Sequence, residues 1–331
     1  MSNEPVQLPS LWEHDNLLAW CVVRYDDMKR GPQERAQMLE RLGFRHYAYD
    51  WPEINAAIFD AEIEALQNRQ IDLTACWFSL EADDPGAKAI LETFKRHNIH
   101  PQLWVPLFAD DVLKAVNAQV KMMPKPAEWQ KLSDAKRKHI IAKLQKSLSP
   151  TVARDFPKTA EEQERRVIRE ANRLNALVKL AAPYGCKIML YNHNAWAGMI
   201  ENQVAVIERL AALGVTDIGI VYNFRHARDE FHDDSKNFPA LWEKMKAHVV
   251  VVNVTGMQME GLDIYPSQGN GELEMMHTIE ASGWQGRVGL IAEKGGDAEI
   301  TLKNYITGLD WLAAEIRQPG SGGPRPFAQV L

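Results

Sequence analysis

KIMLYNHNAWAGMIENQVAVIERLAALGVTDIGIVYN, residues 187–223, contains one complete strand–helix–strand pattern. An apolar run at 187–191 predicts a strand. The segment 199–213 has apolar positions at helical spacing, and a second apolar run follows at 218–222. A strand, a helix and another strand in this order form a parallel βαβ unit. The stretch therefore predicts a parallel sheet covered by helices.

The same alternation extends along the chain on both sides of this unit. Strands are predicted at 17–23, 45–51, 71–79, 101–107, 187–191, 218–222, 249–253 and 288–291. Helices are predicted at 32–44, 54–69, 85–97, 159–184, 199–213, 239–247, 271–282 and 297–312. Eight such units in 331 residues fit an α/β fold with one closed (β/α)₈ TIM barrel. An open doubly wound sheet is the alternative, but no GxGxxG motif follows the first strand.

The predicted barrel covers residues 17–315, between an N-terminal segment at 1–16 and a flexible tail at 316–331 that is rich in Gly and Pro. A helical insertion at 108–158 follows the fourth strand. From residue 121 to residue 158, ten Lys and Arg face three Asp and Glu. The insertion is either a solvated basic excursion or a mobile lid, because insertions after strands lie on the active-site side of a barrel.

Composition excludes several classes of partner. The net charge of −6 gives no reason to expect nucleic-acid binding. No apolar run is long enough to span a bilayer, and the N-terminus lacks the pattern of a signal peptide. The three cysteines contain no CxxC pair, which favours reduced thiols. We therefore expect a cytoplasmic protein that binds neither nucleic acid nor membrane, and a homo-oligomer is possible.

Polar and aromatic residues gather at the predicted carboxyl ends of the strands, which share one mouth in a barrel. Three of these strands end in an amide: Asn192, Asn223 and Asn253. The whole set comprises Arg24, Tyr25, Tyr49, Asp50, Trp51, Trp77, Trp104, Tyr191, Asn192, His193, Asn223, His226, Asn253, Glu293 and Lys294. Amides and hydroxyls suit hydroxylated ligands, and Trp faces suit sugar rings. The alternative is that each residue has a separate structural role, such as a capped strand end or a core Trp.

Five segments resemble the xylose isomerase-like TIM barrels, the sugar and sugar-phosphate isomerase/epimerase group that also includes endonuclease IV relatives. They are GPQERAQMLERLGFRHYAYDW, YNHNAW, VYNFRHARDE, NVTGM and TLKNYITGLDWL. The resemblance covers most of the chain from Leu17 to Leu312, without the insertion. It implies a carbohydrate substrate, but it does not identify one.

The resemblance also implies a metal position. Typical members bind one divalent metal through Glu, Asp, His and Glu at four late strand ends, and two of these carboxylates move a proton next to a carbonyl. Here those positions hold Tyr191, Asn223, Asn253 and Glu293. Neutral amides supply little charge to a hard cation, so a divalent metal is disfavoured. A site rebuilt from His193, His226 and Glu293 is the alternative, and the sequence leaves the cofactor unknown.

We expect proton transfer next to a carbonyl, with Glu293 as the first choice of base, His226 as the second and His193 as the third. Arg24 and Lys294 could stabilise a developing negative charge. The expected substrate-binding residues are Arg24, Asp50, Trp77, Trp104, Tyr191, Asn192, Trp196, Asn223, Asn253 and Lys294. The predicted function is a sugar isomerase or epimerase. The alternatives are a carbon–oxygen lyase or hydratase acting on an oxidised sugar, and a non-catalytic sugar-binding protein.

Overall fold

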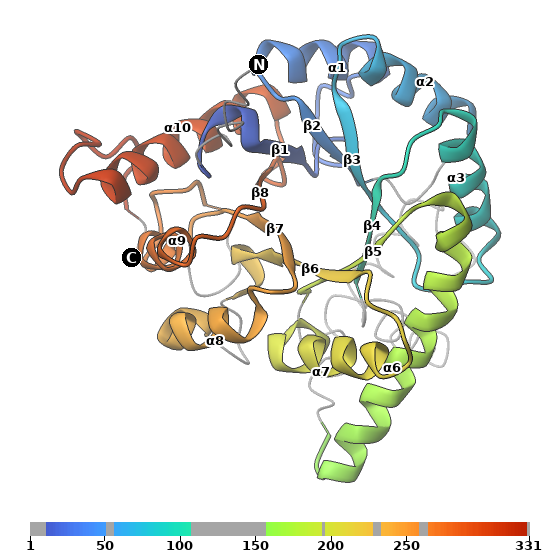
Figure 1. The fold of residues 1–331 in the computed structure, drawn as a ribbon. Coiled ribbons are helices and arrows are strands. Elements are labelled where there is room, and N and C mark those ends of the chain that lie inside the picture. The colour runs from blue at the N-terminus through green and yellow to red at the C-terminus, as the bar shows by residue number, and fades with distance from the viewer. Residues whose placement is uncertain are drawn as a thin grey trace, which may run out of the picture.

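Eight parallel strands close into one barrel in the order in which they occur along the chain (Figure 1). The computed structural model describes residues 11–50, 56–106, 157–193, 196–227, 233–257 and 264–329. The strands are β1 (Leu17–Trp20), β2 (His46–Tyr49), β3 (Asp72–Trp77), β4 (Gln102–Pro106), β5 (Ile188–Tyr191), β6 (Ile218–Asn223), β7 (Val249–Asn253) and β8 (Arg287–Ile291). The predicted (β/α)₈ barrel is confirmed, and the open sheet is excluded.

Helices surround this barrel (Figure 1). They are α1 (Pro32–Arg41), α2 (Ala56–Gln67), α3 (Pro85–Arg96), α6 (Ala160–Ala181), α7 (Ile200–Ala211), α8 (Phe238–Met245), α9 (Glu272–Ala281) and α10 (Ala298–Arg317). Short 3₁₀ turns are η1 (His14–Asn16), η3 (Ala182–Tyr184), η4 (Trp196–Gly198), η5 (Phe224–Ala227) and η6 (Asp234–Asn237). Every predicted helix is present within a few residues of its expected ends. Among the described helices, none has the length and apolar character needed to cross a bilayer.

Local capping explains where the helices begin. The Thr159 hydroxyl accepts a 3.1 Å hydrogen bond from the Glu162 N–H and so satisfies one donor at the start of α6. The Asp297 carboxylate caps α10 in the same way, by accepting a 2.9 Å bond from the Glu299 N–H. In both helices the first residues are therefore stabilised by a local hydrogen bond, which needs no tertiary contact.

Closure of the barrel follows from the pairing of β1 with both β2 and β8. Leu18 is the partner of His46 on one side and of Gly289 on the other. All four residues of β1 and all six of β6 are buried. Helices cover the outer face of these parallel strands, and packed side chains cover the inner face. Because both faces are buried, the strands are continuous apolar runs in the sequence.

The barrel interior is filled by an aromatic cluster below its mouth. The Trp20 ring lies 4.8 Å from that of Trp104 and 4.9 Å from that of Tyr191, both edge to face, and it stacks on Trp77 at 5.9 Å. Such pairs contribute about 0.5–1.5 kcal/mol each beyond area burial. This cluster gives the mouth a rigid aromatic floor.

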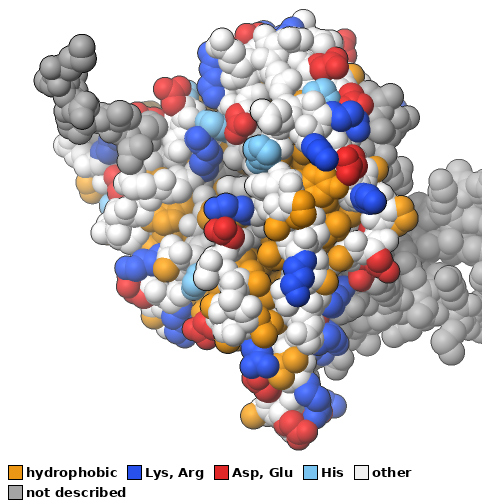
Figure 2. Space-filling model, turned by 45° about the vertical axis from the view of Figure 1, so that its right-hand side comes forward, with side chains coloured by type: hydrophobic (Ala, Val, Ile, Leu, Met, Phe, Trp, Pro, Cys, Tyr) orange, Lys and Arg blue, Asp and Glu red, His pale blue; other side chains and the backbone are white. Residues whose placement is uncertain are grey.

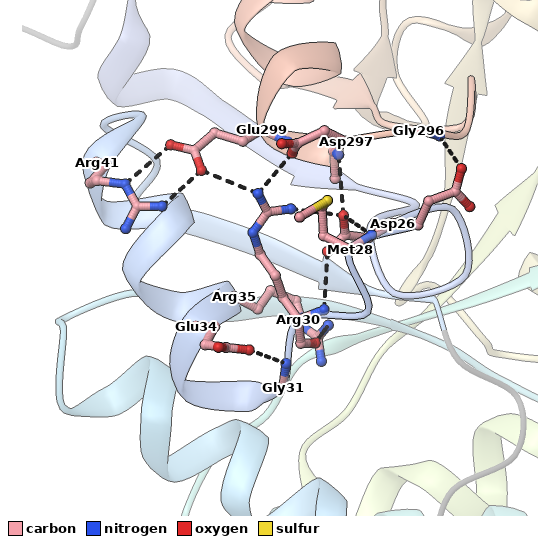
Figure 3. A network of polar contacts seen from close by, with 12 residues as sticks. Asp26, Met28, Arg30, Gly31, Glu34, Arg35, Arg41, Gly296, Asp297 and Glu299 are labelled. Carbon is pink, nitrogen blue, oxygen red and sulfur yellow. Dashed lines mark hydrogen bonds and ion pairs between the residues drawn. The ribbon is translucent and has the colours of Figure 1, made fainter.

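An ion-pair network holds the β1–α1 loop against the start of α10 (Figure 3). The Arg30 guanidinium donates to the Asp26 carboxylate at 2.7 Å and to that of Asp297 at 2.8 Å. The Asp26 side chain is buried, so this pair is shielded from water. The network fixes the loop that carries Arg24 and Tyr25.

The surface mixes charges of both signs. Figure 2 shows Lys and Arg interspersed with Asp and Glu on the face it presents, with hydrophobic side chains between them. The predicted insertion at 108–158 falls almost entirely outside the described residues, and so does Trp51. Whether the insertion is a lid therefore stays a prediction.

Candidate active site

A pocket opens at the carboxyl ends of the strands, above the aromatic floor. It encloses about 540 Å³ of empty space, part of it open to solvent. Its lining is Trp20, Cys21, Arg24, Tyr25, Asp50, Trp77, Tyr191, His193, His226 and Glu293. The fold therefore brings together in one pocket the three predicted acid–base residues and four of the predicted binding residues, Arg24, Asp50, Trp77 and Tyr191.

Glu293 follows β8, and both of its carboxylate oxygens have partners. Oε1 accepts a 2.8 Å hydrogen bond from the Tyr25 hydroxyl, and Oε2 forms an ion pair with the Arg225 guanidinium. Burial and the neighbouring Glu293 carboxylate raise the pKa of Tyr25, so Tyr25 stays a hydrogen-bond donor. Charge-assisted contacts of this kind fix the orientation of the carboxylate.

Two histidines also line the pocket. The rings of His193 and His226 are 4.5 Å apart, and the Tyr191 ring meets that of His226 edge to face at 5.4 Å. Burial lowers the pKa of His193 to about 4, and the nearby Arg225 charge acts in the same direction. His193 is therefore a neutral imidazole at neutral pH, suited to hydrogen bonding with hydroxyl groups.

Asp50 follows β2 and has a different environment from Glu293. Its residue exposure is 6%, and Oδ1 accepts a 3.3 Å hydrogen bond from the Val23 N–H. Oδ2 is buried and has no hydrogen-bond partner among the described residues. Burial raises the pKa of Asp50 to about 6, against the opposing effect of backbone N–H groups, that of Val23 first.

Three residues of this region were not among the sequence candidates: Trp20, Cys21 and Arg225. Cys21 directly follows β1 and has a φ of +54°, an unusual conformation for a residue with a Cβ. Burial, then Asp50 and then Glu293 raise the pKa of its thiol, so it stays protonated. No sequence signal marks the positive φ. Arg225 could have been noticed, because it lies between two candidates, Asn223 and His226.

The side-chain amide of Asn192, just after β5, binds the backbone of Asn223 at the end of β6. Asn192 Nδ2 donates to the Asn223 carbonyl at 3.1 Å, and the Asn223 N–H donates to Asn192 Oδ1 at 2.7 Å. The Asn223 side chain also donates to the Tyr191 hydroxyl and accepts a 3.0 Å bond from the Arg225 N–H. Both amides are fully buried behind the pocket lining. They position Tyr191 and Arg225 and do not face a ligand directly.

Asn253, at the end of β7, is fully buried next to the neighbouring strand. Neither polar atom of its side chain has a hydrogen-bond partner among the described residues. A Cβ built on Gly289 would lie 1.6 Å from Asn253 Oδ1, so the amide occupies the space that a side chain at Gly289 would need. Asn253 does not line the pocket.

The structure places three other predicted binding residues outside the pocket lining. Trp104 is fully buried below it and donates to Gln102 Oε1 at 3.0 Å. Trp196 packs outside the barrel, where its indole N–H donates to Gln163 at 2.6 Å. Lys294 extends over the Tyr265 ring, with 4.3 Å between its ammonium and the ring centroid. Tyr49 packs against Phe59, also away from the pocket.

The donor set does not fit a divalent metal. Burial raises the pKa of Tyr191, so its phenol stays neutral, and the Asn223 amide already donates to it. Glu293 is engaged by Arg225, whose positive charge opposes a cation at that carboxylate. Within the described ranges, no three His, Cys, Asp or Glu side chains gather as a metal site, so the alternative site built from His193, His226 and Glu293 is not formed there.

Comparison with solved structures finds the same fold in xylose isomerase-like proteins. The xylose isomerase domain protein from Planctomyces limnophilus matches with a TM-score of 0.56 and 10% identity, over 92% of this chain and 98% of that one. The IolI protein with a bound zinc atom matches at 0.56 and 13%, over 91% and 98%. D-Allulose 3-epimerase from Methylomonas sp. in complex with D-allulose matches at 0.50 and 10%, over 90% and 91%. The predicted family resemblance is thus confirmed at the level of the fold.

No family model matches the sequence, and no curated protein matches it.

Proposed function

We propose that this protein is an isomerase or epimerase of a sugar or sugar derivative that works by proton abstraction next to a carbonyl. The fold is shared with a structure described as an allulose epimerase and with xylose isomerase domain proteins, which supports a reaction of this class. The pocket adds the chemistry: aromatic walls, hydroxyl-binding imidazoles and an oriented carboxylate.

The observation that carries the proposal is the setting of Glu293. Its carboxylate lines the pocket, and each of its two oxygens has a partner, Tyr25 or Arg225. A base fixed in this way meets the substrate carbon without first losing rotational freedom. In this proposal Glu293 takes the proton, and Trp20 and Trp77 pack against the apolar face of the sugar.

Arg24 supplies positive charge at the rim of the pocket. Its side chain is exposed and makes no ion pair with the described residues, whereas the nearby Asp26 is paired with Arg30. A free guanidinium can bind a carboxylate or phosphate of the substrate, or stabilise the enolate oxygen formed by proton abstraction. Sugar acids and sugar phosphates therefore belong in a substrate panel beside neutral keto sugars.

The test is exchange of carbon-bound protons with D₂O, followed by NMR for this panel. We expect the parent protein to introduce deuterium next to the carbonyl of at least one compound. Glu293→Gln should lower that rate by at least ~100-fold, because general-base catalysis contributes 10²–10⁴-fold. The control is Glu243→Gln, an exposed carboxylate of α8 paired with Lys246, which should leave the rate unchanged.

Other outcomes would contradict the proposal. Exchange by Glu293→Gln at the parent rate would remove Glu293 from the reaction. A product that has lost a hydroxyl group would assign the pocket to carbon–oxygen lyase chemistry. Binding of a sugar without any exchange would assign it to a sugar-binding protein.

A further inference from the structure

We propose that Asp50 selects the substrate by one of its hydroxyl groups, which donates a hydrogen bond to the buried carboxylate oxygen Oδ2. This inference rests on the proposed function for the carbohydrate nature of the ligand. It assigns Asp50 to substrate recognition and gives it no part in the proton transfer.

The Asp50 carboxylate is held in place by the backbone. It directly follows β2, lines the pocket and is 6% exposed. Oδ1 accepts the 3.3 Å hydrogen bond from the Val23 N–H, which limits rotation of the carboxylate. The second oxygen, Oδ2, is buried and has no hydrogen-bond partner among the described residues. The orientation of this oxygen is therefore set before a ligand binds.

An unpaired acceptor of this kind is unusual in a folded protein. Most buried side-chain polar atoms have at least one hydrogen-bond partner, so an exception calls for an explanation. Glu293 is no such exception, because both of its carboxylate oxygens already have partners. Of these two carboxylates of the pocket lining, Asp50 is therefore the one that keeps an acceptor for a ligand.

The chemistry of this oxygen defines the group that it binds. A carboxylate oxygen only accepts hydrogen bonds, so its partner must be a donor, and a sugar hydroxyl is one. Trp20, which also lines the pocket, offers the complementary group from the neighbouring strand β1. Its buried indole N–H has no acceptor among the described residues. Because a hydroxyl both donates and accepts, a ligand with several hydroxyl groups can satisfy both atoms.

The negative charge of Asp50 also determines where an anionic substrate group can bind. A phosphate or carboxylate next to Asp50 would be repelled by the like charge. Arg24 lies in the same pocket lining, is exposed and carries a positive charge. A substrate with an anionic group should therefore place that group near Arg24 and a neutral hydroxyl at Asp50.

The hydrogen bond to Oδ2 should contribute strongly to affinity. Hydrogen bonds to a charged group are stronger than those between neutral groups, and an acceptor that is already fixed loses little freedom on binding. A sugar that lacks this hydroxyl leaves Oδ2 unpaired. Removal of the hydroxyl should therefore weaken binding at least ~10-fold.

The test is a cycle between protein and ligand that is read out as the dissociation constant. The background is the full-length Glu293→Gln protein, which should bind the sugar without converting it. Calorimetry measures binding at pH 8, above the pKa of about 6 that burial gives Asp50. The ligands are the sugar that the parent converts and its deoxy analogues, each with one hydroxyl replaced by hydrogen. We expect one analogue to bind at least ~10-fold more weakly than the sugar.

Asp50→Asn is then added to this background. Its amide oxygen can keep the hydrogen bond from the Val23 N–H, which places an NH₂ group where Oδ2 accepted. The sugar should bind at least ~10-fold more weakly, whereas the analogue that makes no bond to Oδ2 should bind as before. Asp310→Asn, which alters an exposed carboxylate paired with His14, should leave every affinity unchanged.

Three results would overturn the role of Asp50. A background protein that binds every analogue as it binds the sugar selects no hydroxyl group. If Asp50→Asn weakens the sugar and all analogues by the same factor, its effect is structural, and unchanged affinities show that Oδ2 meets no ligand group. If Asp50→Asn does not fold, Asp50→Ser replaces it with the same expected loss of selectivity, and retained selectivity contradicts the proposal.

Failure of the proposed function itself looks different. In that case the parent exchanges no carbon-bound proton with any compound of the panel. The cycle is then run in the parent with a sugar that it binds, so recognition by Asp50 is still tested, and a protein that binds no sugar contradicts both proposals. Loss of the Asp50 role alone leaves proton exchange by the parent and its dependence on Glu293 intact.

Discussion

Asp50 and His193 are titratable groups of the same pocket, and loss of hydration moves their pKa values in opposite directions. Burial raises the pKa of the Asp50 carboxyl to about 6 because the charged form loses its hydration. It lowers the pKa of the His193 imidazole to about 4 for the same reason. At neutral pH, His193 is neutral and Asp50 is close to its titration range.

This difference predicts how Asp50 affects stability. A carboxyl whose pKa is raised from 3.8 to about 6 on folding contributes stability that is full below pH 4 and is lost as the pH rises through 6. Between pH 4 and pH 7 the parent should lose about 2 kcal/mol on this account, and Asp50→Asn should not. Urea unfolding of both proteins at the two pH values measures the difference. A difference that does not change with pH would contradict the raised pKa.

His193 acts with the opposite sign over an overlapping range. Its contribution is full above its ordinary pKa of 6.5 and is lost as the pH falls through 4. The pH dependence of stability due to Asp50 and that due to His193 partly cancel in the parent. The contribution of Asp50 is therefore measured as the difference in unfolding free energy between Asp50→Asn and the parent at each pH.

The residues at the strand ends determine which side chains reach the pocket. From the sequence we predict that Asn192, Asn223 and Asn253 lie at these strand ends and bind the substrate. In the structure Asn192 and Asn223 hydrogen-bond each other across β5 and β6. Whether a side chain at a strand end faces the pocket depends on strand register, because successive side chains of a strand point to opposite faces. These strands are buried on both faces, so their sequences show no alternation of apolar and polar residues from which the register could be predicted.

The pair Asn253 and Gly289 tests the register of β7 against β8. Gly289→Ala places a methyl group on Asn253 Oδ1 and should destabilise the protein by roughly 1–3 kcal/mol. Asn253→Ala removes the amide that occupies this space. The double variant should then be more stable than the sum of the single changes by at least ~1 kcal/mol. Unfolding free energies of the four proteins give the cycle, and simple additivity would contradict the contact.

At the scale of the whole molecule, the fold was predictable and the electrostatics of the site were not. Eight repeats of strand and helix, with caps such as Thr159 and Asp297, specify the barrel locally. The pairing of Arg225 with Glu293 joins β6 to β8, and that of Arg30 with Asp297 joins the β1–α1 loop to α10 (Figure 3). Such pairs connect residues far apart in sequence and have no local pattern, so they appear only once the barrel is closed.

We expect this pocket to move a carbon-bound proton without a divalent metal. The most direct test of this expectation is the D₂O exchange rate of the purified protein before and after removal of metals with a chelator, with the metal content measured in parallel. Because Tyr191, Asn223 and Asn253 supply no anionic ligand and Arg225 engages Glu293, we expect the same exchange rate in both samples. Loss of exchange in the chelated sample, with recovery when a divalent cation is added back, would show instead that the reaction needs a metal.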